Sequence, residues 1–412
     1  MVTVYLPTRR QGRRSSPTPR WPAPPLTIVL VLALLLAACS DGNSADGDTP
    51  DTTIDPYPLD DELRLNDIQV LGSHNSYHVQ PEDELFDVMA AVTSIATVLE
   101  YTHVPLDEQL SEQGIRQMEI DVYADPEGGL YHQRAAPELL GLDSATGPEE
   151  LLEPGFKVLH YQDLDFLSTC LTLVECLRTV KQWSDANPLH VPIMITIEPK
   201  DDVIDIIEQF VDLTEPVEFT AALLDDLDAE IRSVFDEQDL ITPDDVRGEF
   251  PTLEEAVTTE GWPTLGESRG KVLFTMTDTG EAKEAYLDGH PTLEGRVMFT
   301  DSGPGEPAGA FVRVDDPLGD GERITELVEQ GFLVLTRTDA DTAEARADDT
   351  TRREAALSSG AQFVSTDYPV PDDDLGNDYF VEIPGGVPAR CNPLIAPPDC
   401  EPDDIENPEY LR

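Results

Sequence analysis

The chain has 412 residues, of which 40% are hydrophobic, so it is long enough for one large domain with additional terminal segments. Acidic residues outnumber basic residues by 83 to 26, which gives a formal net charge of −57. A field of this sign repels polyanions and therefore excludes nucleic acid as a partner. We interpret the acidic excess as a solvated or salt-adapted surface rather than as the mark of one charged partner.

The N-terminal segment has the pattern of an export signal. Five arginines and no acidic residue occur in residues 1–38, and an apolar run over 26–36 leads into Ala37-Ala38-Cys39. This run is shorter than the roughly 20 residues of a membrane-spanning helix, so we expect a signal peptide over 1–38. Leu36-Ala37-Ala38-Cys39 resembles the bacterial lipobox, which implies that Cys39 is lipidated. An ordinary signal peptide or an anchor without lipid is the alternative, and the export route stays open.

Composition divides the rest of the chain into three parts. Residues 39–62 are rich in Asp, Gly, Thr and Pro and predict a flexible acidic tether. The folded domain is expected over 63–370, and a Pro- and Asp-rich extension follows over 371–412.

Four cysteines remain after the lipidation site, namely Cys170, Cys176, Cys391 and Cys400. An even number of cysteines in an oxidising compartment predicts disulfides. The local pairs 170–176 and 391–400 are the simplest of the three possible connectivities, and the sequence leaves the choice open. A zinc site is disfavoured because neither pair has a CxxC spacing or a histidine at ligand spacing.

Short apolar and β-branched segments alternate with helical patterns along the domain. Strands are predicted over 68–71, 117–122, 192–198, 271–276, 297–300, 311–314, 332–336 and 363–366. Helices are predicted over 171–186, 203–213, 324–330 and 342–358. Eight strands with intervening helices predict an α/β fold, a parallel (β/α)8 barrel of the TIM type.

Polar residues follow the predicted strands at their carboxyl ends, where the active sites of such barrels lie. Glu119 and Asp121 are two residues apart on one strand, so their side chains point to the same side. Together with Asn75 and Glu198, at the ends of two other strands, they form a set of oxygen ligands. Such a set suits Ca²⁺ or Mg²⁺, and an exported protein meets abundant Ca²⁺. We therefore predict a Ca²⁺ site here, with solvated strand-end acids as the alternative.

Two of the seven histidines lie where they could take part in chemistry. His74 directly follows the first strand, and His160 ends an apolar segment and precedes Asp163 and Asp165. Two histidines beside a carboxylate cluster can divide the acid and base roles in phosphodiester cleavage. His78 stays open between a role in a binding pocket and packing beside it.

Five segments strongly resemble the bacterial calcium-dependent phosphoinositide phospholipases C. They are QVLGSHNSYH over 69–78, QMEIDVY over 117–123, the segment 160–170, PIMITIEPK over 192–200 and GAQFVSTDYP over 360–369. The resemblance covers roughly residues 63–370. It implies the TIM barrel of the PLC-like phosphodiesterases. It also implies a Ca²⁺-dependent enzyme that cleaves phosphatidylinositol-type lipids to diacylglycerol and a cyclic or open inositol phosphate.

The resemblance implies roles for single residues. His74 is expected to act as the general base on the inositol 2-hydroxyl, and His160 as the general acid for the diacylglycerol oxygen. The four oxygen-bearing residues are expected to bind Ca²⁺, and Lys200 to contact phosphate. Arg337 is a further substrate-binding candidate from its position alone. The usual His-Ile-Pro-Asp of the family is replaced by His160-Tyr161-Gln162-Asp163, so the loop that aims His160 lacks the proline.

Two other functions compete with this interpretation. A glycerophosphodiester phosphodiesterase shares the barrel and the paired histidines, but its usual His-Arg-Gly is absent because Asn75-Ser76 follows His74. A non-catalytic calcium-binding surface lipoprotein is expected to lack one of the two histidines. We therefore expect a monomeric enzyme outside the cytoplasm, lipid-anchored or secreted, that acts on a phosphoinositide lipid at a membrane surface.

Overall fold

The computed structural model describes residues 56–411 except 93, 142–144 and 203–212. The predicted signal peptide, Cys39 and most of the tether therefore lie outside the described residues. The same is true of most of the helix predicted over 203–213. Within the described part of the chain, no helix has both the length and the apolar character that crossing a membrane requires.

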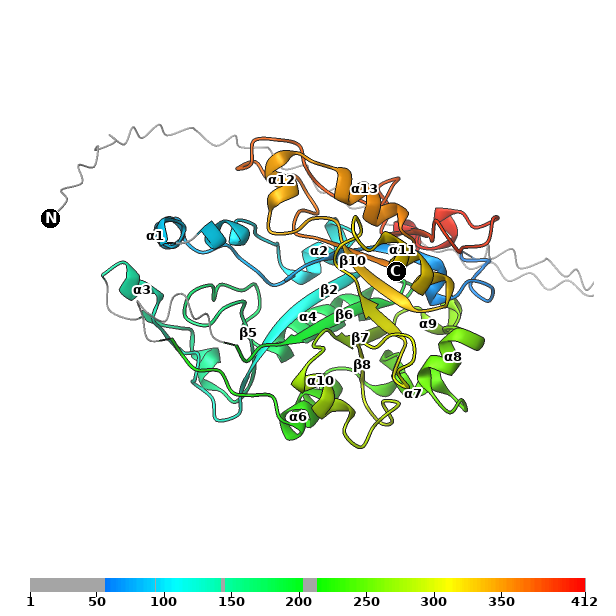
Figure 1. Cartoon of the computed structure of the whole chain (residues 1–412), viewed down its shortest axis with the longest axis horizontal. Coiled ribbons are helices and arrows are strands. Elements are labelled where there is room, and N and C mark those ends of the chain that lie inside the picture. The colour runs from blue at the N-terminus through cyan, green and yellow to red at the C-terminus, as the bar shows by residue number, and fades with distance from the viewer. Residues whose placement is uncertain (1–55, 93, 142–144, 203–212, 412) are drawn as a thin grey trace, which may run out of the picture. The chain divides into compact units, whose positions relative to one another are not determined.

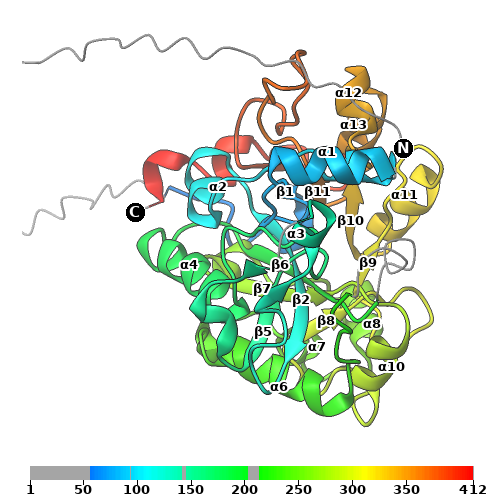
Figure 2. The same cartoon turned by 90° about the vertical axis from the view of Figure 1, so that its left-hand side faces the viewer.

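Parallel strands form the centre of the domain (Figures 1 and 2). In spatial order, the described residues form β8 (Met298–Thr300), β7 (Val272–Met276), β6 (Ile193–Pro199), β2 (Gln117–Asp125), β1 (Ile68–Ser73), β11 (Phe363–Thr366), β10 (Leu333–Arg337) and β9 (Phe311–Arg313). A parallel bridge between Asp301 and Phe311 joins the two ends of this order, so the sheet is nearly closed. Each predicted strand is present, which confirms the TIM-type barrel.

Helices surround the sheet in both cartoon views (Figures 1 and 2). They are α1 (Asp83–Val92), α2 (Leu106–Glu112), α3 (Ala136–Leu139), α4 (Leu173–Ala186), α6 (Ala221–Arg232), α7 (Pro243–Arg247), α8 (Leu253–Thr259), α9 (Leu265–Ser268), α10 (Glu281–Leu287), α11 (Gly321–Glu329), α12 (Ala343–Ala347) and α13 (Thr351–Ser358). The helices predicted over 171–186 and 324–330 correspond to α4 and α11. The single helix predicted over 342–358 is wrong. The chain breaks between α12 and α13 because Asp348 takes a left-handed conformation, with φ of 52°.

Burial on both faces explains the apolar strand segments. In β6, the consecutive side chains of Ile193, Met194, Ile195 and Thr196 are all fully buried, as expected for a parallel strand covered by helices outside and packed inside. Helix α4 begins after Thr172, whose hydroxyl accepts a hydrogen bond from the backbone N–H of Glu175. Its apolar face, which includes Leu173 and Leu177, is buried in the main core.

Additional strands and both ends of the described chain pack onto the barrel. β5 (Gly155–Val158) pairs with β2, and β12 (Ala389–Cys391) pairs with β1, both antiparallel. β3 (Gln133–Arg134) and β4 (Ala145–Thr146) form a separate small sheet. Tyr57 is buried, and the C-terminal segment contributes the buried Glu406. Packed structure therefore extends beyond residues 63–370 at both ends.

The four cysteines form the two local disulfides. Cys170 pairs with Cys176 at the start of α4, and Cys391 pairs with Cys400 in the C-terminal extension. Of the three connectivities that the sequence allows, the structure has the one with the shortest loops. Two disulfides fit a protein that folds in an oxidising compartment.

Candidate active site

A cavity of about 250 Å³ opens at the carboxyl ends of the barrel strands. Its walls include both candidate catalytic histidines, three of the four candidate metal ligands and both candidate substrate-binding cations, namely His74, His160, Asn75, Asp121, Glu198, Lys200 and Arg337. The fourth candidate ligand, Glu119, lies behind Asp121 on β2 and is fully buried. The structure thus brings together side chains from β2, β6 and β10 and from the segments that follow β1, β5 and β6.

Glu119, Asp121 and Glu198 form one carboxylate cluster. Asp121 on β2 lies opposite Glu198 on β6 in the strand register, and one oxygen from each of the three carboxylates lies within 4.8 Å of the others. Glu119 Oε2 and Asp121 Oδ1 are buried without a hydrogen-bond partner. Buried polar atoms normally have partners, so a cluster of three carboxylates that includes two unpartnered oxygens fits a hard divalent cation.

The pKa values of Asp121 and Glu198 are shifted in opposite directions. Burial raises the pKa of Asp121 well above its ordinary value, and the neighbouring Glu198 and Glu119 add to the rise despite the opposing charge of Lys200. For Glu198, Lys200 and Arg313 outweigh burial and lower the pKa to about 2. Lys200 Nζ lies 3.0 Å from Glu198 Oε1 and 3.5 Å from Asp121 Oδ2. One buried carboxyl thus resists ionisation, and a bound cation would relieve this cost.

Asn75 lies in a tight turn after β1 and lines the same cavity as Asp121 and Glu198. Its φ is 43°, a left-handed conformation that asparagine tolerates better than most residues. The turn is held to β2 because the backbone N–H of Ser76 donates to the carbonyl of Glu119, at 2.9 Å. The amide nitrogen of Asn75 donates to the hydroxyl of Tyr101, at 3.0 Å, so its carbonyl oxygen is the atom available as a ligand.

His74 is oriented by a carboxylate that an arginine holds in place. His74 Nδ1 lies 2.7 Å from Asp367 Oδ1, and Arg337 Nη2 donates to Asp367 Oδ2 at 2.9 Å. Although burial opposes it, the charges of Arg337 and His74 hold the pKa of Asp367 below its ordinary range. The Nδ1 atom therefore carries the hydrogen, which leaves Nε2 with a free lone pair when the ring is neutral.

His160 is oriented in the same way by Asp165, which a second histidine also holds. His160 Nδ1 lies 2.7 Å from Asp165 Oδ2, and His78 Nε2 lies 2.9 Å from the same oxygen. The other ring nitrogen of His78 lies 3.1 Å from the carbonyl oxygen of Tyr101. Burial lowers the pKa of His160 to about 4, although Asp165 opposes this shift. His78 is fully buried and packs behind the cavity.

A hairpin sets the aim of His160 without the proline of the family motif. The backbone N–H of Tyr161 donates to the carbonyl of Asp165 at 2.9 Å, and the N–H of Asp165 donates back at 3.0 Å. Asp163 at the tip has a φ of 66°, and its carboxylate accepts hydrogen bonds from the backbone of Ala135 and Thr214. The hydrogen bonds of this short turn replace the stiffness that a proline would provide.

Three side chains of this site were not predicted from the sequence. Asp165 lies only 5 residues after His160, but Asp367 is 293 residues from His74, and no local pattern indicates that contact. Arg313 ends β9 and points into the cavity, where its Nη1 lies 2.9 Å from Glu119 Oε1. The available signal was an arginine near the end of an apolar strand, the same signal that singled out Arg337.

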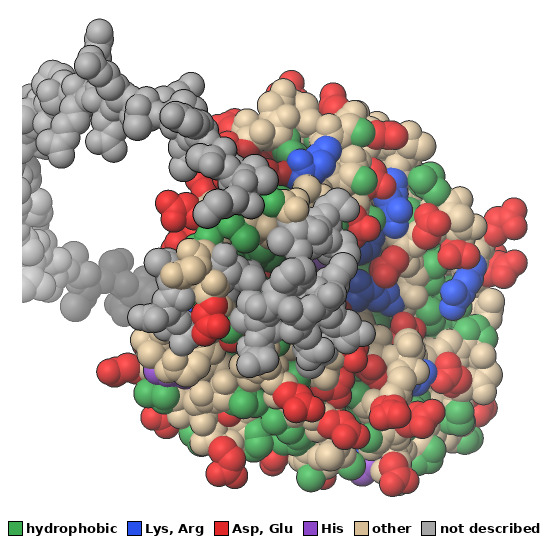
Figure 3. Space-filling view, turned by 60° about the vertical axis from the view of Figure 1, so that its left-hand side comes forward, with side chains coloured by type: hydrophobic (Ala, Val, Ile, Leu, Met, Phe, Trp, Pro, Cys, Tyr) green, Lys and Arg blue, Asp and Glu red, His purple; other side chains and the backbone are tan. Residues whose placement is uncertain are grey.

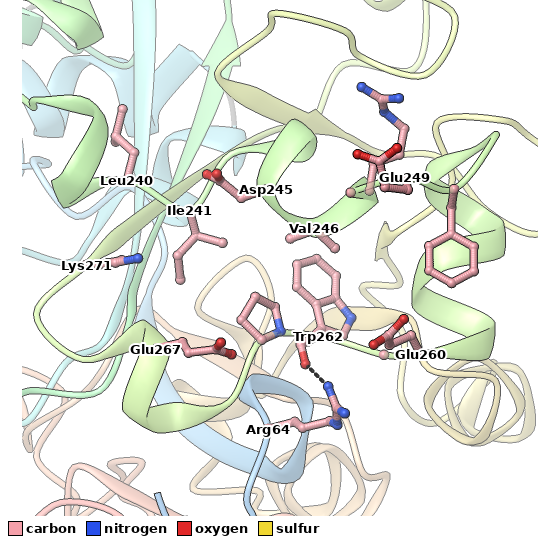
Figure 4. A pocket seen from close by; sticks show the side chains of 15 residues that line it. Arg64, Leu240, Ile241, Asp245, Val246, Glu249, Glu260, Trp262, Glu267 and Lys271 are labelled. Atoms are coloured by element: carbon pink, nitrogen blue, oxygen red, sulfur yellow. Dashed lines mark hydrogen bonds between the residues drawn. The ribbon is translucent and has the colours of Figure 1, made fainter. Parts of the chain in front are cut away.

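A second cavity has a volume of about 460 Å³, and Figure 4 shows the side chains that line it. Lys271 and Arg64 precede strands β7 and β1, and with Trp262 they line this cavity. Arg64 is turned to the backbone carbonyl of Trp262, as the dashed line in Figure 4 shows. The cavity lacks the histidines and the carboxylate cluster. Figure 3 shows acidic side chains scattered over the described part of the visible face, with fewer Lys and Arg side chains among them.

The chain matches one family of known proteins and is similar to several solved structures. The family described as phosphoinositide phospholipase C, Ca²⁺-dependent, matches residues 63–393. No curated protein sequence matches the chain. Solved structures of similar fold include a calcium-dependent phosphoinositol-specific phospholipase C from Pseudomonas sp, in its myoinositol complex (16% identity, 81% of this chain and 97% of that chain, TM-score 0.48).

Two further solved structures are similar over most of their length. One is a Ca²⁺-dependent phosphatidylinositol-specific phospholipase C from Streptomyces antibioticus (19% identity, 74% of this chain and 95% of that chain, TM-score 0.46). The other is a glycerophosphoryl diester phosphodiesterase from Parabacteroides distasonis (14% identity, 82% and 94%, TM-score 0.27). The family match covers most of the barrel and its mouth, so this chain belongs to the Ca²⁺-dependent phosphoinositide phospholipase C family of enzymes.

Proposed function

We propose that the protein cleaves phosphatidylinositol-type lipids by attack of the inositol 2-hydroxyl on its own phosphate, which releases diacylglycerol and a cyclic inositol phosphate. One observation carries this proposal. Two histidines, each aimed by a buried carboxylate, line the same cavity as a carboxylate cluster with unpartnered oxygens. This is the arrangement that general acid–base cleavage of a phosphodiester requires.

His74 is proposed as the general base. Its Nδ1 hydrogen is held by Asp367, so the free Nε2 accepts the proton of the inositol 2-hydroxyl as that oxygen bonds to phosphorus. Asp367 then stabilises the imidazolium that forms, and Arg337 keeps Asp367 ionised and fixed. Arg337 therefore acts through Asp367, besides lining the cavity.

His160 is proposed as the general acid that protonates the diacylglycerol oxygen when its bond to phosphorus breaks. This role requires the imidazolium, whereas burial lowers the pKa of the free enzyme's His160 to about 4. The negative phosphate and the ionised Asp165 favour the charged ring once substrate fills the cavity. The proton that His74 gains and the proton that His160 gives up balance over the step.

The cation is proposed to be held by Asn75, Glu119, Asp121 and Glu198. When bound there, Ca²⁺ would stabilise negative charge on the phosphate and lower the pKa of the attacking hydroxyl. Lys200 lines the same cavity and donates a hydrogen bond to Glu198, and it is proposed to contact the phosphate as well. We further propose that Cys39 carries a lipid that holds the enzyme at a membrane surface.

The test is to incubate the purified protein with phosphatidylinositol vesicles and to follow soluble products by ³¹P NMR, in Ca²⁺ and in excess chelator. We expect a cyclic inositol phosphate in Ca²⁺ and no product in chelator. Absence of any inositol phosphate in Ca²⁺ would contradict the proposed function. Equal rates in chelator would support the phosphodiesterase activity but exclude a role for the metal in it. Glycerophosphoinositol as a parallel substrate separates this activity from a glycerophosphodiesterase, which would release glycerol phosphate.

A further inference from the structure

Arg313 makes an ion pair with the least accessible member of the carboxylate cluster. Its Nη1 lies 2.9 Å from Glu119 Oε1 and 3.7 Å from Glu198 Oε2. The Glu119 side chain is 0% exposed, so water does not hydrate its charge. The Arg313 side chain is 16% exposed and reaches Glu119 from the cavity. A guanidinium thus stands against two of the carboxylates that the proposed function assigns to the cation.

Arg313 holds Oε1 of Glu119, whereas Oε2 is the oxygen without a partner. A guanidinium and a divalent cation on the two oxygens of one buried carboxylate lie close together and repel each other strongly, because little solvent screens them. Arg313 therefore opposes cation binding, and we expect it to move away from Glu119 when a cation occupies the cluster.

Arg313 has another partner and room to move. Its Nε donates to Asp315 Oδ1 at 2.8 Å, and Asp315 is about half exposed. Arg313 and Asp315 both line a cavity of about 640 Å³ that borders the carboxylate cluster and shares Glu198 and Lys200 with the catalytic cavity. The guanidinium can therefore swing away from Glu119 while Asp315 keeps hold of its Nε.

We propose that Arg313 is an internal competitor for the cation, which neutralises Glu119 when no cation is bound and sets the Ca²⁺ concentration at which the site fills. This inference rests on the proposed ligand set. A cluster without Arg313 would bind Ca²⁺ more tightly, but its buried carboxylates would be unpaired when no Ca²⁺ is bound. Arg313 therefore lowers the affinity for the cation and stabilises the cation-free enzyme.

The test measures Ca²⁺ binding by isothermal titration calorimetry, without substrate, for the wild type and the Arg313→Met variant. We expect the Kd of the variant to be about tenfold lower. Arg323, an exposed side chain in the first turn of α11, provides the matched control. Its replacement, Arg323→Met, removes the same charge without a contact to the cluster and should change the Kd by less than about twofold.

Salt separates direct competition from long-range attraction. The Debye length falls from about 8 Å at about 0.15 M salt to about 3 Å at about 1 M, so a long-range effect of the lost charge disappears in high salt. The tighter binding of Arg313→Met should persist in both conditions. An unchanged or weaker affinity, or a gain that vanishes in high salt, would overturn the inference.

A second variant covers the case in which Arg313→Met folds poorly. Asp315→Asn removes the charge of the alternative partner, so Arg313 holds Glu119 more firmly and Ca²⁺ should bind about threefold more weakly than in the wild type. Tighter binding in Asp315→Asn would contradict the competition. Loss of Ca²⁺ binding in Glu119→Gln with no effect of Arg313→Met would keep the proposed metal site and sink the inference alone. Absence of Ca²⁺ binding in the wild type would sink both.

Discussion

Buried charges occur at both ends of the barrel, but they are completed in different ways. At the end where the strands begin, Arg116 donates to Glu406 from Nε at 3.0 Å and from Nη2, and its Nη1 donates to two backbone carbonyls. The second oxygen of Glu406 also accepts the backbone N–H of Val191, at 2.7 Å. At the end where the strands finish, Glu119 and Asp121 are equally buried and each keeps an oxygen without a partner.

This contrast separates a structural charge pair from a binding site. In a buried ion pair whose hydrogen bonds are all made, each charge offsets the desolvation cost of the other. Removing one partner therefore strongly destabilises the protein. A buried carboxylate with a free oxygen is costly as it stands and persists where a ligand completes it. Burial alone therefore does not identify the site, whereas two unpaired carboxylate oxygens within one cluster of three carboxylates do.

The largest expected effect concerns the two histidines at the mouth. Replacing His74 or His160 by Asn removes a proton-transfer group, so kcat should fall about 10³-fold while the melting temperature changes little. The measurement is phosphatidylinositol turnover in saturating Ca²⁺. His290→Asn is the matched control, because His290 follows α10 and lies outside the catalytic cavity. Full activity in His160→Asn would show that another group protonates the leaving oxygen.

A pair of neutralising substitutions sharpens the contrast between the two ends. Glu406→Gln leaves the buried Arg116 without its counter-charge, so the free energy of unfolding should fall by about 3–5 kcal/mol. Glu119→Gln removes one of three crowded carboxylates, so it should abolish Ca²⁺ binding and cost less stability in chelator than Glu406→Gln. Urea unfolding in chelator measures both. A larger loss for Glu119→Gln would reverse our assignment of structural and ligand roles.

His78 should matter to the rate rather than to substrate binding. It holds Asp165, which aims His160, but it does not line the catalytic cavity. In His78→Asn, a misaimed His160 should lower kcat by up to roughly 100-fold and leave KM nearly unchanged. Steady-state kinetics on mixed micelles separate the two constants. A change in KM alone would show that His78 shapes the substrate pocket instead.

The smallest expected effect is a pH dependence of stability. The pKa of His160 is about 4 in the folded protein against an ordinary value of 6.5, so between these pH values the unfolded chain binds more protons. This histidine therefore makes the protein less stable as the pH falls from about 6.5 to about 4. Urea midpoints across this range should vary less with pH in His160→Gln than in the wild type. Parallel curves would contradict the burial of a neutral imidazole.

The barrel could be predicted from the sequence because its strands are continuous apolar runs, such as residues 193–197, between helical segments. The gathering of Glu119, Asp121 and Glu198 followed from the rule that parallel strands end on one face. Contacts between distant segments could not be predicted. Glu406 meets Arg116 across 290 residues, and Asp165 meets His78 across 87, with no local pattern to indicate either pair.

Local backbone conformation was predicted only in part. The break falls within Asp348-Asp349-Thr350-Thr351, four residues of low helix propensity between two stretches of helix formers, a local signal that the prediction of a single helix passed over. Arg313 was overlooked because Phe311-Val312-Arg313-Val314 has the pattern of a buried strand, and an arginine at a strand end shows its role only when the opposite carboxylates are in place.

The central claim is that the carboxylate cluster and Asn75 bind Ca²⁺. It is tested most directly by an anomalous difference map from crystals grown in Ca²⁺. We predict one strong peak within coordination distance of oxygens from Asn75, Glu119, Asp121 and Glu198, with Arg313 turned away from Glu119. A map with no peak there, and with the Arg313–Glu119 ion pair intact, would contradict the account.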